Sequence, residues 1–202
     1  MKRHIIISAL ALMGVFGCRG PVASTDFTAD ELALIHDAEG IMRVLTIDNP
    51  SDAAVLRAES HNLTEEALVS EDYAQLCSLM VATVTHPSQD GVGIAGPQVG
   101  LNRRVVAVQR FDKEGEPFEV YPNISIVKAS ASKEYGPEGC LSVPDMRGEV
   151  LRSTEVVVEY DRIAADGTVE TVKETIKDFT AVIFQHEIDH LEGILYIDRL
   201  KK

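Results

Sequence analysis

The most regular pattern of hydrophobic and polar positions lies at residues 73–84. Apolar side chains recur there at spacings of three and four residues, which is the period of an amphipathic α-helix. Pro87 follows closely and ends the pattern, because proline cannot continue a helix. The sequence therefore predicts a helix over Tyr73–Val84, with Cys77 among its apolar positions as a buried core thiol.

Shorter runs of β-branched and apolar residues predict strands further along the chain. Residues 103–111 form one such run, and residues 118–130 form a strand pair or one bent strand. Residues 153–176 contain two runs of high strand propensity joined at Asp166-Gly167, a dipeptide typical of tight hairpin turns. The pattern therefore predicts several strands, including an antiparallel hairpin.

The last helical pattern covers roughly residues 179–191. Asp178 is expected to cap its first turn, and Gly193 is expected to end it. The predicted strands and helices are grouped rather than strictly alternating. The fold class is therefore α+β, with mostly antiparallel strands packed around a C-terminal helix.

The first 18 residues follow a different pattern. Lys2 and Arg3 precede an apolar run at residues 5–16, and Gly17-Cys18 follow it. A charged start, a short apolar run and a small residue before cysteine are typical of a lipoprotein-type signal peptide, in which Cys18 is lipidated. The apolar run is too short to cross a bilayer as a stable helix.

This interpretation divides the chain into three parts. Residues 1–18 are the signal peptide, residues 19–41 are a partly helical tether, and residues 42–202 are the main domain. The expected location is a membrane, reached through lipidated Cys18. An alternative start of translation at Met42 still leaves a full domain and predicts a cytoplasmic product.

Composition narrows the classes of partner. The chain has 202 residues, of which 45% are apolar and 25% charged, so it is long enough for one globular domain with a hydrophobic core. The net charge of −13 argues against nucleic acid as a partner, because phosphate binding requires a basic face. Its three cysteines are scattered and do not form a disulfide framework.

The final predicted helix contains His186, Glu187 and His190 at the spacing His-Glu-x-x-His. Residues four apart share one face of a helix, so both imidazoles can reach one metal ion. Glu187 points beside them, where it can act on a water molecule rather than bind the ion. The pattern therefore predicts a catalytic metal site.

A catalytic divalent ion usually has three protein ligands and one open position. Asp189 and Glu192 lie on other faces of the predicted helix, and Asp198 lies beyond its end, so they suit supporting or surface roles. The third ligand is therefore expected upstream. Cys140, in the extended-looking segment PEGCLSVP, is the strongest candidate because a thiolate binds a borderline-soft ion well.

Three segments together resemble, in order and spacing, the signature motifs of the peptide deformylase family. They are GVGIAGPQ at 91–98, EGCLS at 138–142 and QHEIDH at 185–190. The resemblance covers roughly residues 42–200. It implies a peptide-deformylase-like fold, with a formyl-Met peptide or nascent chain as substrate and formate as a product.

The resemblance also implies a role for each matching residue at the metal. Cys140, His186 and His190 would hold the ion, and Glu187 would be the general acid and base. Ferrous iron is the ion that the resemblance implies, and zinc is the alternative. Export would favour zinc, because an Fe(II)–thiolate site is vulnerable to oxidation at Cys140.

Further matching residues would contact the substrate or support the ligands. The Gln98 side chain and the Leu141 backbone N–H would donate hydrogen bonds to the developing oxyanion. Glu138 and Arg152 would form a supporting ion pair. The expected substrate-binding residues are Gly93, Val92, Arg147, Phe179, Val182 and Ile183. For the last three and Val92, a plain core role is an equally good interpretation.

Two features depart from the pattern of the family. Gly96 stands where relatives usually have alanine, which is expected to loosen the loop locally, and the N-terminal signal is an addition. Two other functions stay open from the sequence. One is a metallopeptidase that cleaves internal bonds, and the other is a non-catalytic surface lipoprotein that retains the fold.

Overall fold

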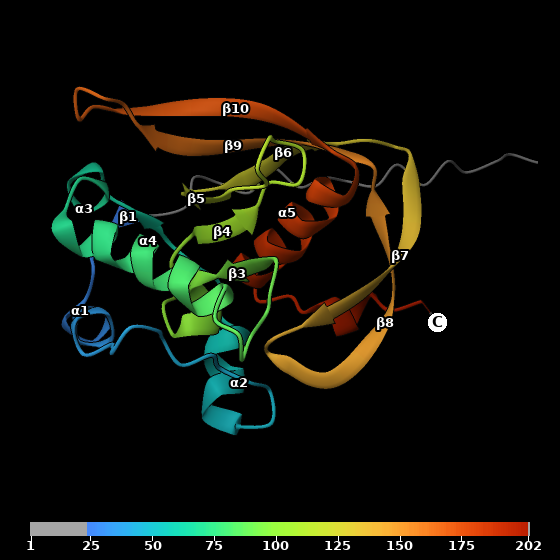
Figure 1. The fold of residues 1–202 in the computed structure, drawn as a ribbon, viewed down its shortest axis with the longest axis horizontal. Coiled ribbons are helices and arrows are strands. Elements are labelled where there is room, and N and C mark those ends of the chain that lie inside the picture. Colours follow the sequence, from blue (N-terminus) through green and yellow to red (C-terminus); the bar gives the residue numbers. More distant parts are fainter. Residues whose placement is uncertain (1–23, 202) are drawn as a thin grey trace, which may run out of the picture.

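The computed structural model describes residues 24–201 (Figure 1). The expected signal peptide and its lipidation residue Cys18 lie outside this range. Within residues 24–201, none of the helices is both long and apolar enough to cross a bilayer. The architecture is α+β, as predicted, with mostly antiparallel strands arranged around the C-terminal helix α5 (Asp178–Leu191).

The first sheet contains β3 (Gly93–Ala95), β4 (Val105–Gln109) and β5 (Phe118–Pro122), paired antiparallel in that order. The apolar run of β4 is fully buried because both faces of this central strand are covered. Alternate side chains of β4 face two different hydrophobic clusters, one shared with α4 and the other with α5. The strand predicted at 103–111 is therefore the layer between two cores.

The second sheet contains β6 (Ser125–Ala129), β9 (Glu155–Ile163) and β10 (Val169–Lys177), with β9 in the middle. β9 and β10 pair antiparallel along their whole length. They are joined by a turn at Gly167, whose φ of +83° favours glycine. This is the predicted hairpin. The strand pair expected at 118–130 is divided between the two sheets, because β5 and β6 pair with different partners.

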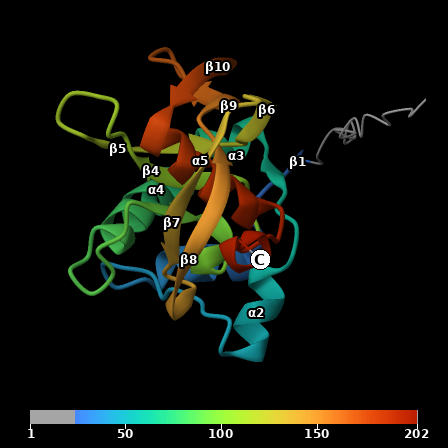
Figure 2. The ribbon, with the colours of Figure 1, turned by 90° about the vertical axis from the view of Figure 1, so that its right-hand side faces the viewer.

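A long hairpin of β7 (Lys133–Cys140) and β8 (Val143–Ser153) lies beside α5. It is on the right of Figure 1 and passes in front of α5 in Figure 2. The pairing register shifts between Glu138 and Cys140, so β7 is irregular just before its last residue. The hairpin brings Cys140 to α5 although the two are far apart in the sequence.

Helix α5 differs from the prediction at its start. Asp178 does not cap it through its side chain; Lys177 occupies the cap position, and Asp178 has a φ of +54°. The reason is that β10 runs directly into the helix, so the backbone reverses direction at this residue, a conformation that aspartate tolerates. The end is as predicted. Gly193 has a φ of +68° and its amide binds the His190 carbonyl.

The helices that precede the first sheet form one wall of the core. α4 (Glu71–Val84) is the predicted helix, and Ser70 caps it by accepting a hydrogen bond from the Tyr73 amide. α2 (Pro50–Leu56) and α3 (Glu65–Leu68) come before it in the sequence. Both are too short to produce a helical period, and neither was predicted.

Residues 24–38, which we call the N-terminal segment, are folded against the domain. β1 (Ser24–Thr25) pairs in parallel with β2 (Asn62–Leu63), and α1 (Ala29–His36) packs against α4 (Figure 1). Ile35 of α1 is fully buried in the cluster that contains α4. Part of the expected tether therefore belongs to the folded domain.

Candidate metal centre and active site

Three predicted ligands come together where β7 ends beside α5. Cys140 is the last residue of β7, and His186 and His190 lie one turn apart on α5. Their ligand atoms all lie within 4.8 Å of one another. Cys140 Sγ is 3.2 Å from His190 Nε2. A thiolate and two imidazoles are a donor set that zinc and ferrous iron accept.

A buried ion pair fixes the orientation of the first histidine. His186 Nδ1 lies 2.8 Å from Glu138 Oε2, which leaves Nε2 to face the other ligands. Arg152 donates to both Glu138 oxygens, at 2.7 and 3.0 Å, and to Asp189 at 2.5 Å. Burial raises the pKa of Glu138, but hydrogen bonds from Arg152 and His186 outweigh burial and lower the pKa to about 2. Glu138 is therefore a carboxylate that orients the imidazole.

The electrostatics of the ligands fit a bound cation. Burial lowers the pKa of His186, but hydrogen bonds to Cys140 and Glu138 outweigh burial and raise the pKa to about 10. The surroundings of this imidazole thus favour a positive charge. The pKa of His190 lies well below its ordinary value because the ring is buried. His190 is therefore neutral, and its Nε2 is turned toward Cys140.

Glu187 lies on the same turn of α5, against β3. Its side chain is buried, and its Oε2 has no hydrogen-bond partner among the described residues. A Cβ added to Gly93 would collide with the Glu187 carboxylate, so glycine is the residue that leaves room for it. Burial raises the pKa of Glu187 to about 7. This carboxyl group can therefore accept and release a proton near neutral pH.

Gln98 lies in the 3₁₀ helix η1 (Gly96–Val99), directly after β3. Its Oε1 accepts a hydrogen bond from the Ala95 amide at 2.9 Å. Its Nε2 donates to Ser142 Oγ at 3.2 Å and lies 3.6 Å from Cys140 Sγ. The amide group is therefore held in one orientation, with its N–H groups beside the ligand cluster.

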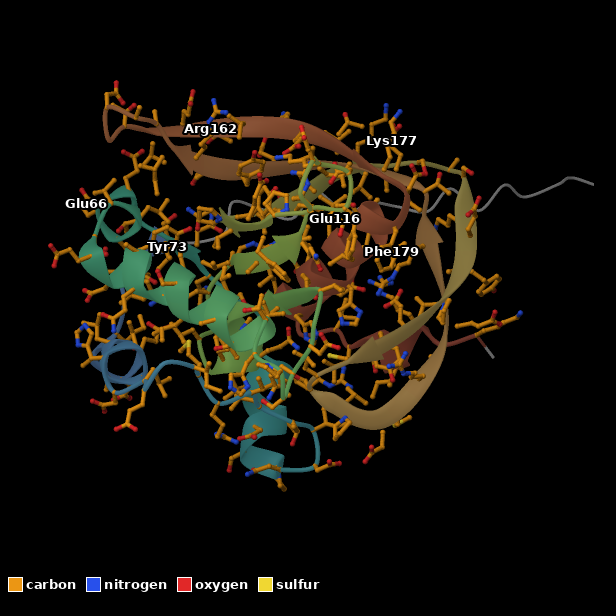
Figure 3. The ribbon with its side chains drawn as sticks, in the orientation of Figure 1. Glu66, Tyr73, Glu116, Arg162, Lys177 and Phe179 are labelled. Carbon is orange, nitrogen blue, oxygen red and sulfur yellow. The ribbon has the colours of Figure 1, made fainter. Side chains whose placement is uncertain are left out.

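A cavity of about 750 Å³ opens over these residues. Gln98, Glu187 and Leu141 line it, together with two ligands, Cys140 and His186. All the predicted substrate-binding residues also line it: Gly93, Val92, Arg147, Phe179, Val182 and Ile183. Figure 3 shows Phe179 at the start of α5, on the side toward β7. His190 and Arg152 are not part of the lining.

The four apolar lining residues differ in whether the alternative interpretation, a plain core role, applies to them. Phe179 is 53% exposed and Val92 is 37% exposed, so neither is a core residue. Ile183 is buried in the cluster that contains α5, and Val182 is half-buried. Only Ile183 therefore serves the core and the cavity at once.

The sequence did not reveal parts of the cavity rim on two of its sides. The missed residues lie before β3 and on the β7–β8 hairpin: Gln89, Asp90, Pro137, Gly139, Val143, Pro144, Asp145 and Met146. Most are exposed, so no hydrophobic pattern marks them. The available signals were their proximity to the Cys140 motif and the turn dipeptide Pro144-Asp145.

The fold and the site together define a metal-dependent hydrolase. A near-neutral carboxyl group and a fixed amide donor stand beside a ligand cluster at the wall of an open cavity. That combination suits attack of water on a carbonyl group, because it provides a proton acceptor and a donor to the developing oxyanion. Comparison with known proteins narrows this class.

The family model described as polypeptide deformylase matches residues 41–202. A peptide deformylase of Leptospira biflexa is 34% identical over 168 residues, which cover 80% of this chain and 88% of the relative. Peptide deformylase 2 of Vibrio cholerae is 39% identical over 161 residues, which cover 79% of this chain and 86% of the relative. This chain belongs to the peptide deformylase family.

Solved structures agree with this assignment. The class I type b peptide deformylase of Acinetobacter baumannii matches with a TM-score of 0.69 and 35% identity, over 80% of this chain and 100% of that one. The peptide deformylase of Thermotoga maritima matches with a TM-score of 0.68 and 32% identity, over 81% and 100%. The predicted family, fold and deformylase activity are confirmed, and neither alternative function is favoured.

Proposed function

We propose that this chain removes the N-formyl group from peptides that begin with N-formylmethionine and releases formate. The observation that carries the proposal is the position of Glu187, which lies in the cavity wall beside two of the three ligand residues. The related Acinetobacter baumannii enzyme has solved structures with Met-Ala-Ser and with actinonin bound. Those complexes support a methionine-first peptide as the ligand of this cavity.

The residues of the chain supply most of the chemistry. A divalent ion held by Cys140, His186 and His190 would act as a Lewis acid and lower the pKa of bound water. Glu187 accepts the proton of the attacking water at its carboxylate and passes it to the leaving amine. Its pKa of about 7 suits both transfers.

Two donors stabilise the negative charge that develops on the carbonyl oxygen. Gln98 Nε2 is one, because the contact of Oε1 with the Ala95 amide holds Nε2 beside Cys140 in the cavity wall. The backbone N–H of Leu141 is the other, at the turn that follows Cys140. The loss of one such donor typically lowers kcat by about 10²–10³-fold.

The substrate peptide lies along the edge of the first sheet. β3 is the edge strand of that sheet, so its backbone at Gly93 is positioned to pair with an added strand. The methionine side chain contacts the apolar residues Val92, Phe179, Val182 and Ile183. Arg147, exposed on the opposite rim, contacts the peptide backbone.

We propose ferrous iron as the native ion, with zinc as the alternative if the protein is exported. The donor set suits both ions. Metal analysis of the protein isolated anaerobically from its native cells tests this. Iron bound in near-stoichiometric amount supports the proposal, whereas zinc with no iron contradicts it.

We propose that lipidated Cys18 attaches the protein to a membrane. The pattern of residues 1–18 supports this. The folded N-terminal segment supports only a start upstream of Met42, because a product that starts at Met42 would lack it. Mass spectrometry of the mature N-terminus decides between the two starts. A diacylglyceryl-modified Cys18 supports attachment, and an N-terminal Met42 indicates a cytoplasmic product instead.

Formate release from formyl-Met-Ala-Ser by residues 19–202, loaded anaerobically with Fe(II), tests the proposed reaction. Acetyl-Met-Ala-Ser is the control substrate and should not be hydrolysed. Glu187→Gln should lower turnover by about 10²–10⁴-fold without loss of metal. A folded, metal-loaded protein that releases no formate would instead indicate a non-catalytic lipoprotein, and cleavage at internal bonds would indicate a metallopeptidase.

A further inference from the structure

The N-terminal segment is an addition to the domain that the family shares. The family model begins at residue 41, whereas residues 24–38 are folded and contribute Ile35 to the core. Thr28 and Glu31 form a reciprocal capping box at the start of α1, so the helix has a defined first turn. The segment therefore has a defined structure, and its contacts with the domain indicate what it does.

The main polar contact of the segment is with Arg103, which lies just before β4. The Arg103 side chain is only 4% exposed. Its Nε and Nη2 both donate to the Glu31 carboxylate at 2.7 Å. Nη1 donates to the Thr25 carbonyl at 3.2 Å, and Nη2 also donates to the Asp26 carbonyl at 2.5 Å.

These contacts mean that a residue of the shared domain depends on the added segment. Every hydrogen bond described for the Arg103 guanidinium ends within residues 25–31. The ring of Phe27, also in the segment, lies 5.9 Å from the Arg103 Cζ atom. A buried guanidinium without such partners is costly, so Arg103 and the segment hold each other in place.

The backbone of Arg103 in turn packs on the loop that carries Gln98. A Cβ on Gly96 would lie 2.6 Å from the Arg103 carbonyl oxygen and 2.8 Å from that of Leu101. The Leu101 amide donates back to the Gly96 carbonyl at 3.0 Å. Glycine at position 96 therefore permits a tight backbone contact, which is the opposite of the expected loosening.

A second contact reaches the same loop from α1. The Leu34 side chain lies 3.2 Å from the position of a Cβ on Gly100, directly after η1. The N-terminal segment thus contacts the loop 96–103 at two points, Gly100 and Arg103. Gln98 lies between Gly96 and Gly100, and its Nε2 is beside the ligand cluster.

We propose that the N-terminal segment is a positioning element for Gln98. By holding Arg103 and placing Leu34 beside Gly100, it fixes the loop 96–103 and so keeps the Gln98 amide aimed at the reacting carbonyl group. The inference rests on the proposed role of Gln98 as an oxyanion donor. The chain departs from the family pattern in the added segment and in Gly96. Both contact Arg103, and both help to fix the loop that carries Gln98.

The test is Glu31→Gln in the metal-loaded protein, because this change removes the charge that holds Arg103 and keeps the size of the side chain. We expect kcat to fall by about tenfold, which is less than the roughly 10²–10³-fold for complete loss of an oxyanion donor. KM and metal content should stay the same. The ligands Cys140, His186 and His190 have no described contact with the segment.

Glu174→Gln is the matched control. Glu174 accepts a hydrogen bond at 2.7 Å from Arg110, another buried arginine, which flanks the other end of β4. Arg110 keeps its contacts with Asp112 and Glu119, as Arg103 keeps its carbonyl partners. Glu174 does not line the cavity. We expect an unchanged kcat for Glu174→Gln. Its decrease in Tm should be smaller than that of Glu31→Gln, because Arg110 keeps two acidic partners whereas Glu31 is the only one described for Arg103.

Hydrogen exchange reports on the position of Gln98 without relying on turnover. The Ala95 amide donates to Gln98 Oε1, and the Leu45 amide donates to the Gln98 carbonyl at 2.8 Å. Both amides should exchange faster in Glu31→Gln and at the ordinary rate in Glu174→Gln. If the unchanged protein released no formate, the proposed reaction would fail while this measurement still tested the positioning.

A purely structural role for the segment predicts different results. Glu31→Gln would then lower Tm with kcat and the exchange of Ala95 unchanged, and the proposal would be overturned. If Glu31→Gln does not fold, Glu31→Gln with Arg103→Met removes both charges and leaves no buried charge unpaired. That double variant should keep the low kcat and fast exchange; full recovery of both would also overturn the proposal.

Discussion

At the scale of single residues, the active site depends on a missing side chain as much as on those present. Gly93 lies on the edge strand β3, and the Glu187 carboxylate occupies the space where a Cβ would project. The carboxyl group is buried there, and burial raises its pKa to about 7. The glycine at position 93 therefore permits both the location and the acidity of the proposed proton carrier.

Gly93→Ala is expected to displace the Glu187 carboxylate and lower kcat by at least tenfold, because proton transfer requires hydrogen-bond distance to the reacting groups. Gly136→Ala is the control, since a Cβ at Gly136 in β7 would meet nothing within 4 Å. Formate release measures the effect, and a Tm scan checks folding. Equal activity of the two variants would show that Glu187 needs no such clearance.

At the scale of secondary-structure elements, the strength of a pattern decided what could be predicted. α4, α5 and the β9–β10 hairpin carry clear periods or a clear turn signal, and their positions follow from the sequence. Most of β8 is exposed, so its eleven residues show no alternation, and the rim of the cavity was missed with it. The three motifs contain the ligands and Glu187, and the structure brings these residues together.

Contacts between distant residues that lie outside the three motifs and their implied partners could not be predicted. Arg103 and Glu31 are 72 positions apart, and no periodicity links a charged residue before a strand to one in a separate helix. The start of α5 shows that a neighbouring element can also override a local sequence preference. An aspartate before a helix favours a side-chain cap, but the direct entry of β10 into the helix fixed the backbone of Asp178 instead.

The docking of the N-terminal segment should be sensitive to acid. Burial raises the pKa of Glu31, but hydrogen bonds from Arg103 and Thr28 outweigh burial and leave the pKa below the ordinary value of 4.5. Because the pKa is lower in the folded state, the carboxylate stabilises the docked segment above about pH 4.5. This stabilisation is lost as the pH falls through the folded pKa.

Hydrogen-exchange protection in residues 24–38, corrected for the intrinsic rate, measures this effect between about pH 6 and pH 3. The segment should lose protection at a higher pH than the β9–β10 hairpin. In Glu31→Gln, protection of the segment should already be lower at pH 6 and should change less with acid. Simultaneous loss of protection everywhere would show that Glu31 has no separate contribution.

At the scale of the whole molecule, the metal centre joins the β7–β8 hairpin to α5. Its ligands come from the end of the β7–β8 hairpin and from α5, the helix that both sheets surround. The ion pair of Glu138 and Arg152 lies behind the ligands and extends to Asp189 on α5. An ion bound at this junction stabilises the arrangement of hairpin and helix, because only the folded state presents all three ligands.

Removal of the metal by chelation should therefore lower Tm and expose one cysteine to alkylation. Iodoacetamide should modify Cys140 in the metal-free protein and not in the loaded one. Cys77 should stay unmodified in both, because burial raises the pKa of its thiol to about 11. Mass spectrometry of the peptides identifies the modified residue. Protection of Cys140 without metal would contradict its role as a ligand.

The pairing of Arg103 with the N-terminal segment also has a consequence for truncation of this protein. A chain without the segment would leave a guanidinium buried at position 103 with an unpaired charge. With the arginine in place, deletion of the segment should therefore destabilise the domain even if the added residues contribute nothing to catalysis. Loss of the segment without this cost requires that Arg103 first be replaced by an uncharged residue.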